Sequence, residues 1–250
     1  MSAQPTTAFH DTPFGRMRSR VVGTPRDDVP EVVLVQGMAV ANYLVPGLTA
    51  LGDWTRAHLV ELPGFSGSGE PPHPLDVGEF GDAVVAWLAA SGLDRVVLMG
   101  HSSGTQVAAR AAARRPPAVR AVVLASPTVA PRFRSWAKVL LAWHRDNRRE
   151  PADLDEQHEP ERRRAGLRRV AHTLRVHLAD HLEDVVPEVR VPLLVLHGER
   201  DLLCTERWAR TLCEFAPDGR FRSVPGPHSF PWVHPRAWSA PVHDLAREVR

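Results

Sequence analysis

The clearest indication of fold in this 250-residue chain is the sequence Arg95-Val-Val-Leu-Met-Gly-His-Ser-Ser-Gly-Thr105. Its first five residues form an apolar run that predicts a buried strand, and residues 105–114 continue as a helical pattern. Between them lies Gly100-His101-Ser102-Ser103-Gly104, a G-x-S-x-G pattern. In this position the pattern predicts a sharp turn that holds the Ser102 hydroxyl clear of the sheet. The free N–H groups of the following helix would then face an oxyanion formed nearby.

Four further apolar runs, rich in Val and Leu, have the length of strands buried on both faces. They cover residues 31–36, 58–62, 120–124 and 191–196. Helical patterns at 75–91 and 105–114 lie between them. This alternation predicts an α/β fold with a mostly parallel central sheet flanked by helices.

The alternation breaks after Pro127 and resumes at Pro192. Residues 128–187 hold 12 basic and 10 acidic side chains, and this difference accounts for the whole net charge of +2. Amphipathic pieces at 136–143 and 167–182 flank a polar middle, 146–164, in which we expect a looser linker. These pieces are too short to bury a core alone. We therefore expect residues 1–127 and 188–250 to form the core, and residues 128–187 to form a helical cap over it.

A serine hydroxyl needs a general base, and the base needs an orienting carboxylate. After the strand at 192–196 comes His197-Gly-Glu-Arg-Asp201, and Val224-Pro-Gly-Pro-His228 precedes the C-terminal helix. Along the chain Ser102 comes first, then Asp201 and then His228. A serine held at a turn between a strand and a helix has its acid and its histidine in this order.

With these motifs the chain resembles the α/β-hydrolases over nearly all of its length outside 128–187. Val33-Leu-Val-Gln-Gly-Met38 resembles the family's oxyanion turn, and Glu61-Leu-Pro-Gly-Phe-Ser-Gly-Ser68 resembles its Asp-x-Pro-Gly-x-Gly-x-Ser loop. Residues 198–201 resemble the acid turn, and residues 227–235 resemble the segment that carries the base. The resemblance implies that Ser102 is the nucleophile, His228 the base and Asp201 its partner. It also implies an oxyanion hole made of the backbone N–H groups of Met38 and Ser103.

Three positions depart from the family pattern. Gln36 replaces the usual His, Glu61 replaces the usual Asp, and Pro227 stands where Gly commonly precedes the base. Because the oxyanion hole is built from backbone N–H groups, Gln36 need not abolish it.

Other histidines and acids compete for the catalytic roles. His101, His197 and His234 are better explained by packing or by contact with solvent. Glu199 lies two residues before the loop position that reaches the base, so we favour Asp201.

The insertion offers a weak metal candidate and an arginine cluster. His177 and His181 are spaced i, i+4 and could share a metal with Asp180 or Asp184, but no H-E-x-x-H pattern supports this and a solvated face is favoured. We expect no metal and no cofactor. The cluster Arg162, Arg163, Arg164, Arg168 and Arg169 lies among acids and is expected to be solvated, although one arginine, or Arg132, could clamp a substrate carboxylate.

Composition limits the location and the partners. Residues 1–20 lack the apolar stretch of a signal peptide, no apolar run approaches the ~18 residues of a membrane span, and we expect a soluble, cytoplasmic protein without a membrane partner. Cys204 and Cys213 lie outside any CxxC spacing. The mixed-sign charge does not predict nucleic-acid binding. A small-molecule substrate is expected, and the oligomeric state stays open.

These features predict a serine hydrolase that cleaves an acyl ester, lactone or thioester through an acyl-enzyme. A C–C bond hydrolase, a cofactor-free perhydrolase and a non-catalytic ligand-binding member of the fold remain as alternatives. The C–C hydrolases carry a Gly-x-Gly-Pro-Gly type loop and a Trp after the base, whereas this chain has Gly37-Met-Ala-Val-Ala-Asn42 and Ser229. Trp136, Leu140, Leu141 and Trp143 suggest an apolar roof over the pocket, or simple packing of the cap.

Overall fold

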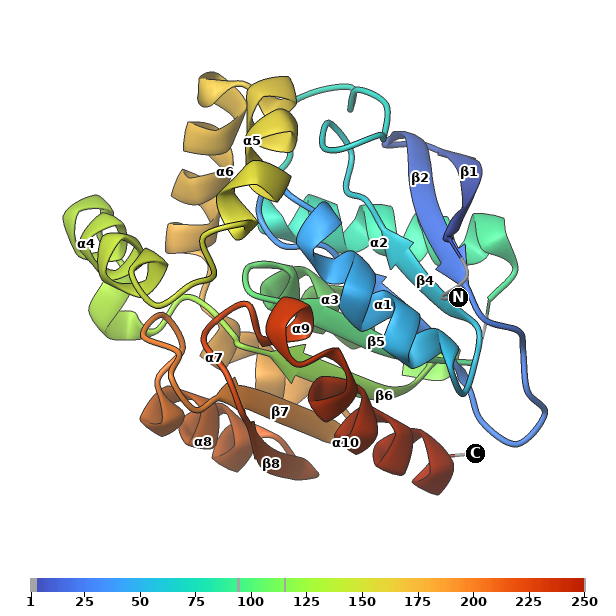
Figure 1. The fold of residues 1–250 in the computed structure, drawn as a ribbon. Helices are drawn as coiled ribbons and strands as arrows, with labels where there is room; N and C mark the ends of the chain where they lie inside the picture. Colours follow the sequence, from blue (N-terminus) through green and yellow to red (C-terminus); the bar gives the residue numbers. More distant parts are fainter. Residues whose placement is uncertain (1–3, 94, 115, 250) are drawn as a thin grey trace.

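The structure is a computed structural model that describes residues 4–249 except 94 and 115. In this part of the chain eight strands form one sheet, in the order β1-β2-β4-β3-β5-β6-β7-β8 (Figure 1). The strands are β1 (Thr6–Thr12), β2 (Gly15–Val22), β3 (Glu31–Val35), β4 (Ala57–Val60), β5 (Val96–His101), β6 (Val119–Ala125), β7 (Leu193–Gly198) and β8 (Gly219–Val224). The helices of the core are α1 (Val45–Gly52), α2 (Val77–Ser91), α3 (Gly104–Arg114), α8 (Glu206–Phe215), α9 (Phe230–Val233) and α10 (Pro235–Glu248).

The sheet is mostly parallel, which confirms the fold class. Strands β3 to β8 pair in parallel, whereas β1 pairs with β2 and β2 with β4 in antiparallel register. The five predicted strands are β3 to β7, and all of them are largely buried. Strands β1, β2 and β8 escaped prediction because they lie toward the edges, where exposed and buried residues mix and polar side chains interrupt the apolar run.

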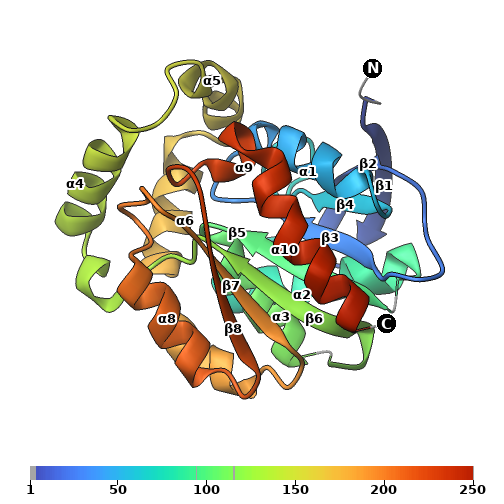
Figure 2. The same cartoon turned by 60° about the horizontal axis from the view of Figure 1, so that its bottom comes forward.

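Helices cover both faces of the sheet. One face packs against α2, α3 and α8, whose buried side chains include Trp87, Val107 and Trp208. The other face packs against α1 and α10 through Leu48 and Trp238 (Figures 1 and 2). The sheet therefore has its two faces buried, and its loops at the carboxyl edge are left to form a site.

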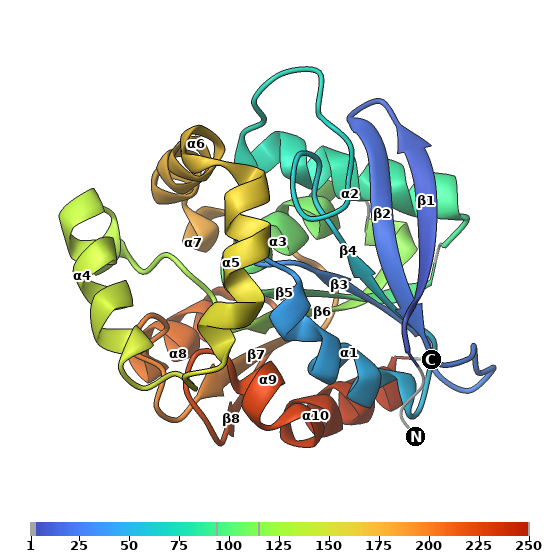
Figure 3. The ribbon, with the colours of Figure 1, turned by 45° about the horizontal axis from the view of Figure 1, so that its top comes forward.

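The insertion between β6 and β7 is helical over most of its length. It contains α4 (Trp136–Asn147), α5 (Leu154–Ala165), α6 (Leu167–Ala179) and α7 (Leu182–Val185). The first three lie together beyond one end of the sheet (Figure 3). No helix in the described part of the chain combines the length and apolar character that crossing a membrane requires.

The linker expected within 146–164 is short. It covers 148–153, between α4 and α5, and α5 occupies most of the remaining residues despite Pro160. Acids in its first turn and arginines in its last complement the helix dipole, and the Glu159–Arg163 pair is spaced i, i+4. The helix predicted at 167–182 ends at Ala179, since Asp180 is extended and its carboxylate pairs with Arg110.

Candidate active site

Ser102 lies at the turn between β5 and α3, as the G-x-S-x-G pattern predicted. Its φ is +56°, a left-handed conformation that is uncommon outside glycine. A Cβ on Gly100 would meet the Gly104 carbonyl oxygen at 2.2 Å, and one on Gly104 would meet the Gln36 carbonyl oxygen at 2.3 Å. Both glycines are therefore required for the strand and the helix to approach each other around Ser102.

Asp201 and His228 form a hydrogen-bonded pair. His228 Nδ1 lies 2.9 Å from Asp201 Oδ2, which also accepts a hydrogen bond of 2.5 Å from the Ser126 hydroxyl. Asp201 Oδ1 accepts from the N–H groups of Leu203 and Cys204 at 2.8 and 2.9 Å. Burial would raise the pKa of Asp201, but the charge of His228 and these hydrogen bonds lower it. The carboxylate is thus held ionised and oriented, as an imidazole partner needs to be.

The competing acid and histidines lie elsewhere. Glu199 is exposed, and its N–H bonds the Val224 carbonyl. His197 stacks on Phe221, and burial lowers its pKa. His234 precedes α10.

His101 contacts the backbone of His228, the predicted base. Its Nδ1 lies 2.6 Å from the Tyr43 hydroxyl and its Nε2 lies 3.0 Å from the His228 carbonyl oxygen. Burial lowers the pKa of His101 to about 3, so it is neutral. A neutral ring that donates from Nε2 and accepts at Nδ1 satisfies both contacts and fixes the backbone of His228.

Ser102 and His228 line one cavity of about 190 Å³. Among the hydrogen bonds of the described residues, none joins these two side chains, and such contacts are often long before substrate binds. A second slot of about 20 Å³ adjoins Ser102 and is mostly apolar. It is lined by Met38, Ser102, Ser103, Thr128, Val129, Phe133, Val139, Trp143, Leu174, His177 and Leu203. Met38 and Ser103, the predicted oxyanion-hole residues, therefore both border the space beside Ser102.

The three departures from the family pattern have local explanations. Gln36 accepts from the Leu62 N–H and donates to the Gly37 carbonyl, so it joins the oxyanion turn to the end of β4. Glu61 is fully buried against two arginines of β2. Pro227 follows Gly226, and the glycine that the family has directly before the base is found here one residue earlier, with a positive φ of +118°.

Two acids of the insertion share this cavity and were missed by the sequence analysis. Asp146 near the end of α4 accepts a hydrogen bond of 2.9 Å from the Leu202 N–H. Glu150 accepts from the N–H and the hydroxyl of Ser229, the residue after the base. Both acids line the cavity with Ser102 and His228. Their i, i+4 spacing directly after the apolar part of α4 was the available signal, but residues 146–164 were interpreted as a polar middle that contains a looser linker.

The charges of this cluster shift its pKa values. Burial raises the pKa of Asp146. Burial also raises the pKa of Glu150, to about 7, although the hydrogen bond from Ser229 acts to lower it. Burial also disfavours protonation of His228, but the charges of Asp201, Asp146 and Glu150 outweigh it and raise its pKa to about 9.

The arginines proposed to bind a substrate carboxylate are mostly outside the cavity. Arg132 lies over the Phe133 ring, and Arg168 lines a separate groove. Arg164 and Arg169 bond the carbonyls of Ser66 and Gly64, so they are not simply solvated. Arg162 does line the cavity.

The metal candidate does not assemble. His177 is buried against Gln106, at 2.9 Å from its Oε1, whereas His181 lies beyond the end of α6 beside Asp184. In residues 4–249, with 94 and 115 left aside, no group of three potential metal ligands comes together.

The chain is similar to known proteins in sequence and in structure. A family described as alpha/beta hydrolase fold matches residues 50–165. N-formylmaleamate deformylase of Pseudomonas putida is 33% identical over 127 residues, which are 46% of this chain, so the chain spans about half (47%) of that relative. The enol-lactonase of Burkholderia xenovorans LB400 superposes with a TM-score of 0.74 at 19% identity, covering 95% of this chain and 99% of its own. A thermophilic esterase from Thermogutta terrifontis gives a TM-score of 0.77 at 20% identity and covers 98% and 99%.

Proposed function

The chain is an α/β-hydrolase-fold protein, and on that premise we propose that it is a cofactor-independent serine hydrolase acting on a small acyl ester, lactone or thioester. One observation carries the proposal: the strained Ser102 turn and His228, which Asp201 holds from behind, border the same cavity. A nucleophile and a base on one cavity wall, with a buried acid that orients the base, are what acyl transfer to water requires.

In the proposed reaction the Ser102 hydroxyl oxygen attacks the acyl carbonyl carbon while His228 Nε2 accepts its proton. The N–H groups of Met38 and Ser103 stabilise the tetrahedral oxyanion. Collapse breaks the bond to the leaving group, which takes the proton from His228. A water molecule then attacks the acyl-enzyme, His228 accepts its proton and returns it to Ser102, and the acid leaves. Asp201 keeps the Nδ1 proton in place throughout.

We propose that residues 128–187 act as a cap that sets the acyl and leaving groups. Supporting this, α4 supplies Trp143 and Asp146 to the cavity wall, and α5 supplies Leu154, His158 and Arg162. Trp136, Leu140 and Leu141 are exposed instead, so of the predicted apolar roof only Trp143 contributes to the cavity.

The charge of the cavity bears on the substrate. Asp146 and Glu150 face His228, and the arginine of the cavity, Arg162, is already paired with Asp155 and Glu159 on its own helix. A substrate carboxylate beside His228 would meet the negative charge of these acids at the pH values where they are ionised, which for Glu150 means above about 7. The cavity therefore favours neutral or cationic substrates, which counts against vinylogous diketo acids and thus against the C–C hydrolase alternative.

A second candidate is removal of a formyl group from an amide nitrogen. It is favoured by the matched deformylase and by the small volume of the apolar slot, about 20 Å³, which suits a very short acyl group. The same nucleophile, base and oxyanion hole would serve.

The test is a substrate panel with paired variants. Wild-type protein is assayed with formyl, acetyl and butyryl esters, a thioester, a lactone, an N-formyl amide and a vinylogous 1,5-diketo acid. Ser102→Ala is expected to lose ~10³-fold or more in kcat, whereas Ser91→Ala at the end of α2 keeps wild-type turnover. Turnover by Ser102→Ala at the wild-type rate would overturn the proposal, and clear preference for the diketo acid would overturn the substrate class.

A further inference from the structure

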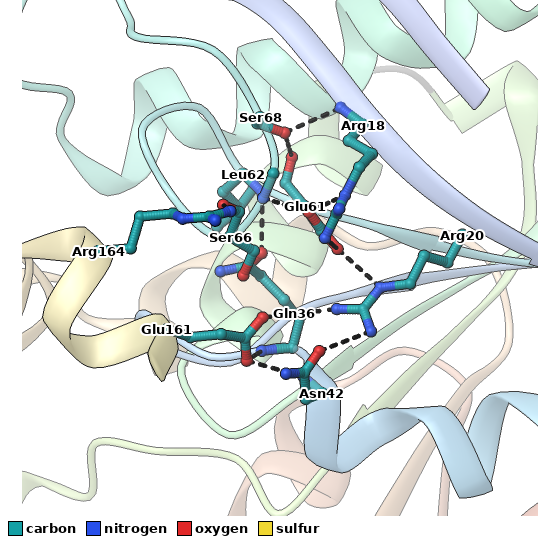
Figure 4. A network of polar contacts seen from close by, with 12 residues as sticks. Arg18, Arg20, Gln36, Asn42, Glu61, Leu62, Ser66, Ser68, Glu161 and Arg164 are labelled. Carbon is teal, nitrogen blue, oxygen red and sulfur yellow. Dashed lines mark hydrogen bonds and ion pairs between the residues drawn. The ribbon is translucent and has the colours of Figure 1, made fainter. Parts of the chain in front are cut away.

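The loop that follows β3 carries Met38 and is anchored at its far end by one side chain of the insertion. Glu161 of α5 accepts hydrogen bonds from the N–H groups of Ala41 and Asn42, at 2.8 and 2.9 Å, through the same oxygen, Oε2 (Figure 4). Glu161 is 120 residues away from this loop in sequence and almost fully buried. The Glu161 carboxylate thus joins α5 to the start of the 3₁₀ helix Asn42–Leu44, because it accepts hydrogen bonds from backbone N–H groups there.

A second set of contacts holds the carboxylate itself. Arg20 of β2 lies 3.5 Å from Glu161 Oε1, and it donates a hydrogen bond of 2.8 Å to the Asn42 side chain. The same guanidinium donates from Nε to Glu61 Oε1 at 2.8 Å. Figure 4 shows Glu161, Asn42 and Arg20 converging between the insertion and the sheet. The carboxylate therefore has a fixed position between α5, the loop and β2.

The segment it anchors is short and strained. Residues 36–41 connect β3 to the 3₁₀ helix, and Ala39 within them has a φ of +64°. Ala39 and Ala41 are buried, so an Ala41 N–H without Glu161 would lose its acceptor away from water. A loop with a left-handed non-glycine residue persists only while its surroundings hold it.

From this geometry we propose that Glu161 is a positioning residue that fixes the Met38 N–H for oxyanion binding and makes the oxyanion loop depend on the seating of α5. The inference rests on the proposed function, because it assigns a purpose to the loop only if Met38 donates to an oxyanion. Glu161 touches no reacting atom. It acts through three residues of backbone, from Ala41 back to Met38.

The test uses Glu161→Gln, which keeps one oxygen for the two backbone N–H groups but loses the charge and turns an amide NH₂ group toward Arg20, with Glu156→Gln as the matched control. Glu156 lies on the same helix and is exposed. For Glu161→Gln we expect kcat to fall about 10–100-fold with KM changed less than about threefold, since removing an oxyanion donor outright costs 10²–10³-fold. Glu161→Asp keeps the charge, and its kcat should lie between those of the wild type and Glu161→Gln. Glu156→Gln should match the wild type.

A second readout separates positioning from general damage. A trifluoromethyl ketone that carries the preferred acyl group forms a tetrahedral adduct, so its inhibition constant should rise in proportion to the loss of kcat/KM. A merely structural defect would lower the titre of active sites and leave that constant unchanged. If folded Glu161→Gln or Glu161→Asp keeps the wild-type kcat and inhibition constant, the inference is overturned. The proposed function would still stand in that case, provided that Ser102→Ala is inactive. Wild-type turnover by Ser102→Ala would remove the proposed function, and the inference with it.

Discussion

His228 is surrounded by more negative charge than a general base at neutral pH requires. Asp201 holds its Nδ1, and Asp146 and Glu150 reach it from the insertion, while the neutral rings of His101 and His158 lie nearby. A pKa of about 9 means that most of the imidazole is protonated at pH 7. A protonated imidazole cannot accept the Ser102 proton, so the acids restrain the base.

The pH profile of the Glu150→Gln variant checks this. In the wild type, kcat/KM for a neutral ester should rise with pH through about 9, as His228 loses its proton. Gln removes a negative charge that favours the imidazolium, so the pKa of His228 falls and the rising limb moves to lower pH. We expect a several-fold higher kcat/KM at pH 7. A limb that stays in place, or moves upward, would contradict the electrostatic account.

The acid of the pair is tested by comparing Asp201→Asn with Glu199→Gln. Asp201→Asn leaves an amide that can hold the imidazole in the wrong tautomer, and kcat should fall by about 10⁴-fold, the loss known for the same change in a serine protease. Glu199 is exposed and its change should leave kcat near the wild-type value. Steady-state kinetics of both variants decide the assignment, which is wrong if Glu199→Gln is the more damaging change.

At the scale of elements, α4 separates two kinds of apolar residue. Trp143 lines both the cavity and the small slot, whereas Trp136 on the same helix is 44% exposed and lines neither. Trp143 is therefore one of the large side chains that bound the slot, with Phe133 and Leu174, and we expect the acyl length that fits to depend on it.

Trp143→Ala should widen the slot and shift acyl preference. The ratio of kcat/KM for a butyryl ester over an acetyl ester is expected to rise by about tenfold or more, since each methylene accommodated is worth ~1–3 kcal/mol. Trp136→Ala is the control and should leave the ratio unchanged. An unchanged ratio in Trp143→Ala would mean that the acyl group lies elsewhere.

The sequence predicted those elements whose pattern is local. The strands β3 to β7 are apolar runs rich in Val and Leu because both of their faces are buried. The Ser102 turn is recognisable from Gly100 and Gly104, two positions where the structure leaves no room for a Cβ atom. Helix α5 lacks an apolar stripe and contains Pro160, so its helicity depends on charge pairs and on tertiary contacts such as that of Glu161. The positions of Asp146 and Glu150 in the cavity could not be predicted from the sequence either, because no local pattern shows which charged residues of an insertion face inward.

For the molecule as a whole, the N-terminal hairpin is joined to the core by a buried charge. Glu61 is fully buried and receives Arg18 through two hydrogen bonds of 2.6 Å and Arg20 through one of 2.8 Å. It also accepts the Gly67 N–H at 2.6 Å, which fixes the loop after β4. One carboxylate thus links β2, the end of β4 and the loop that Arg164 and Arg169 of the insertion contact.

Glu61→Gln should therefore destabilise the fold. It leaves two arginines facing an uncharged amide, and breaking a buried pair costs about 3–5 kcal/mol, with the lower end expected here because Arg18 is partly exposed. For a chain of this size that corresponds to a fall in Tm of roughly 6–12 °C. Glu70→Gln, which removes an exposed partner of Arg169, should change Tm far less. Equal Tm values for the two variants in thermal unfolding would contradict the role given to Glu61.

We propose above all that Ser102 forms a covalent acyl-enzyme with His228 as its base. Peptide mapping by mass spectrometry after treatment with a fluorophosphonate tests it most directly, because the reagent reacts with a serine only where a base activates it. We predict one adduct per chain, on the peptide that contains Ser102, absent from Ser102→Ala and formed far more slowly in His228→Asn. An adduct on another residue, or an unlabelled Ser102 in folded wild-type protein, would contradict the account.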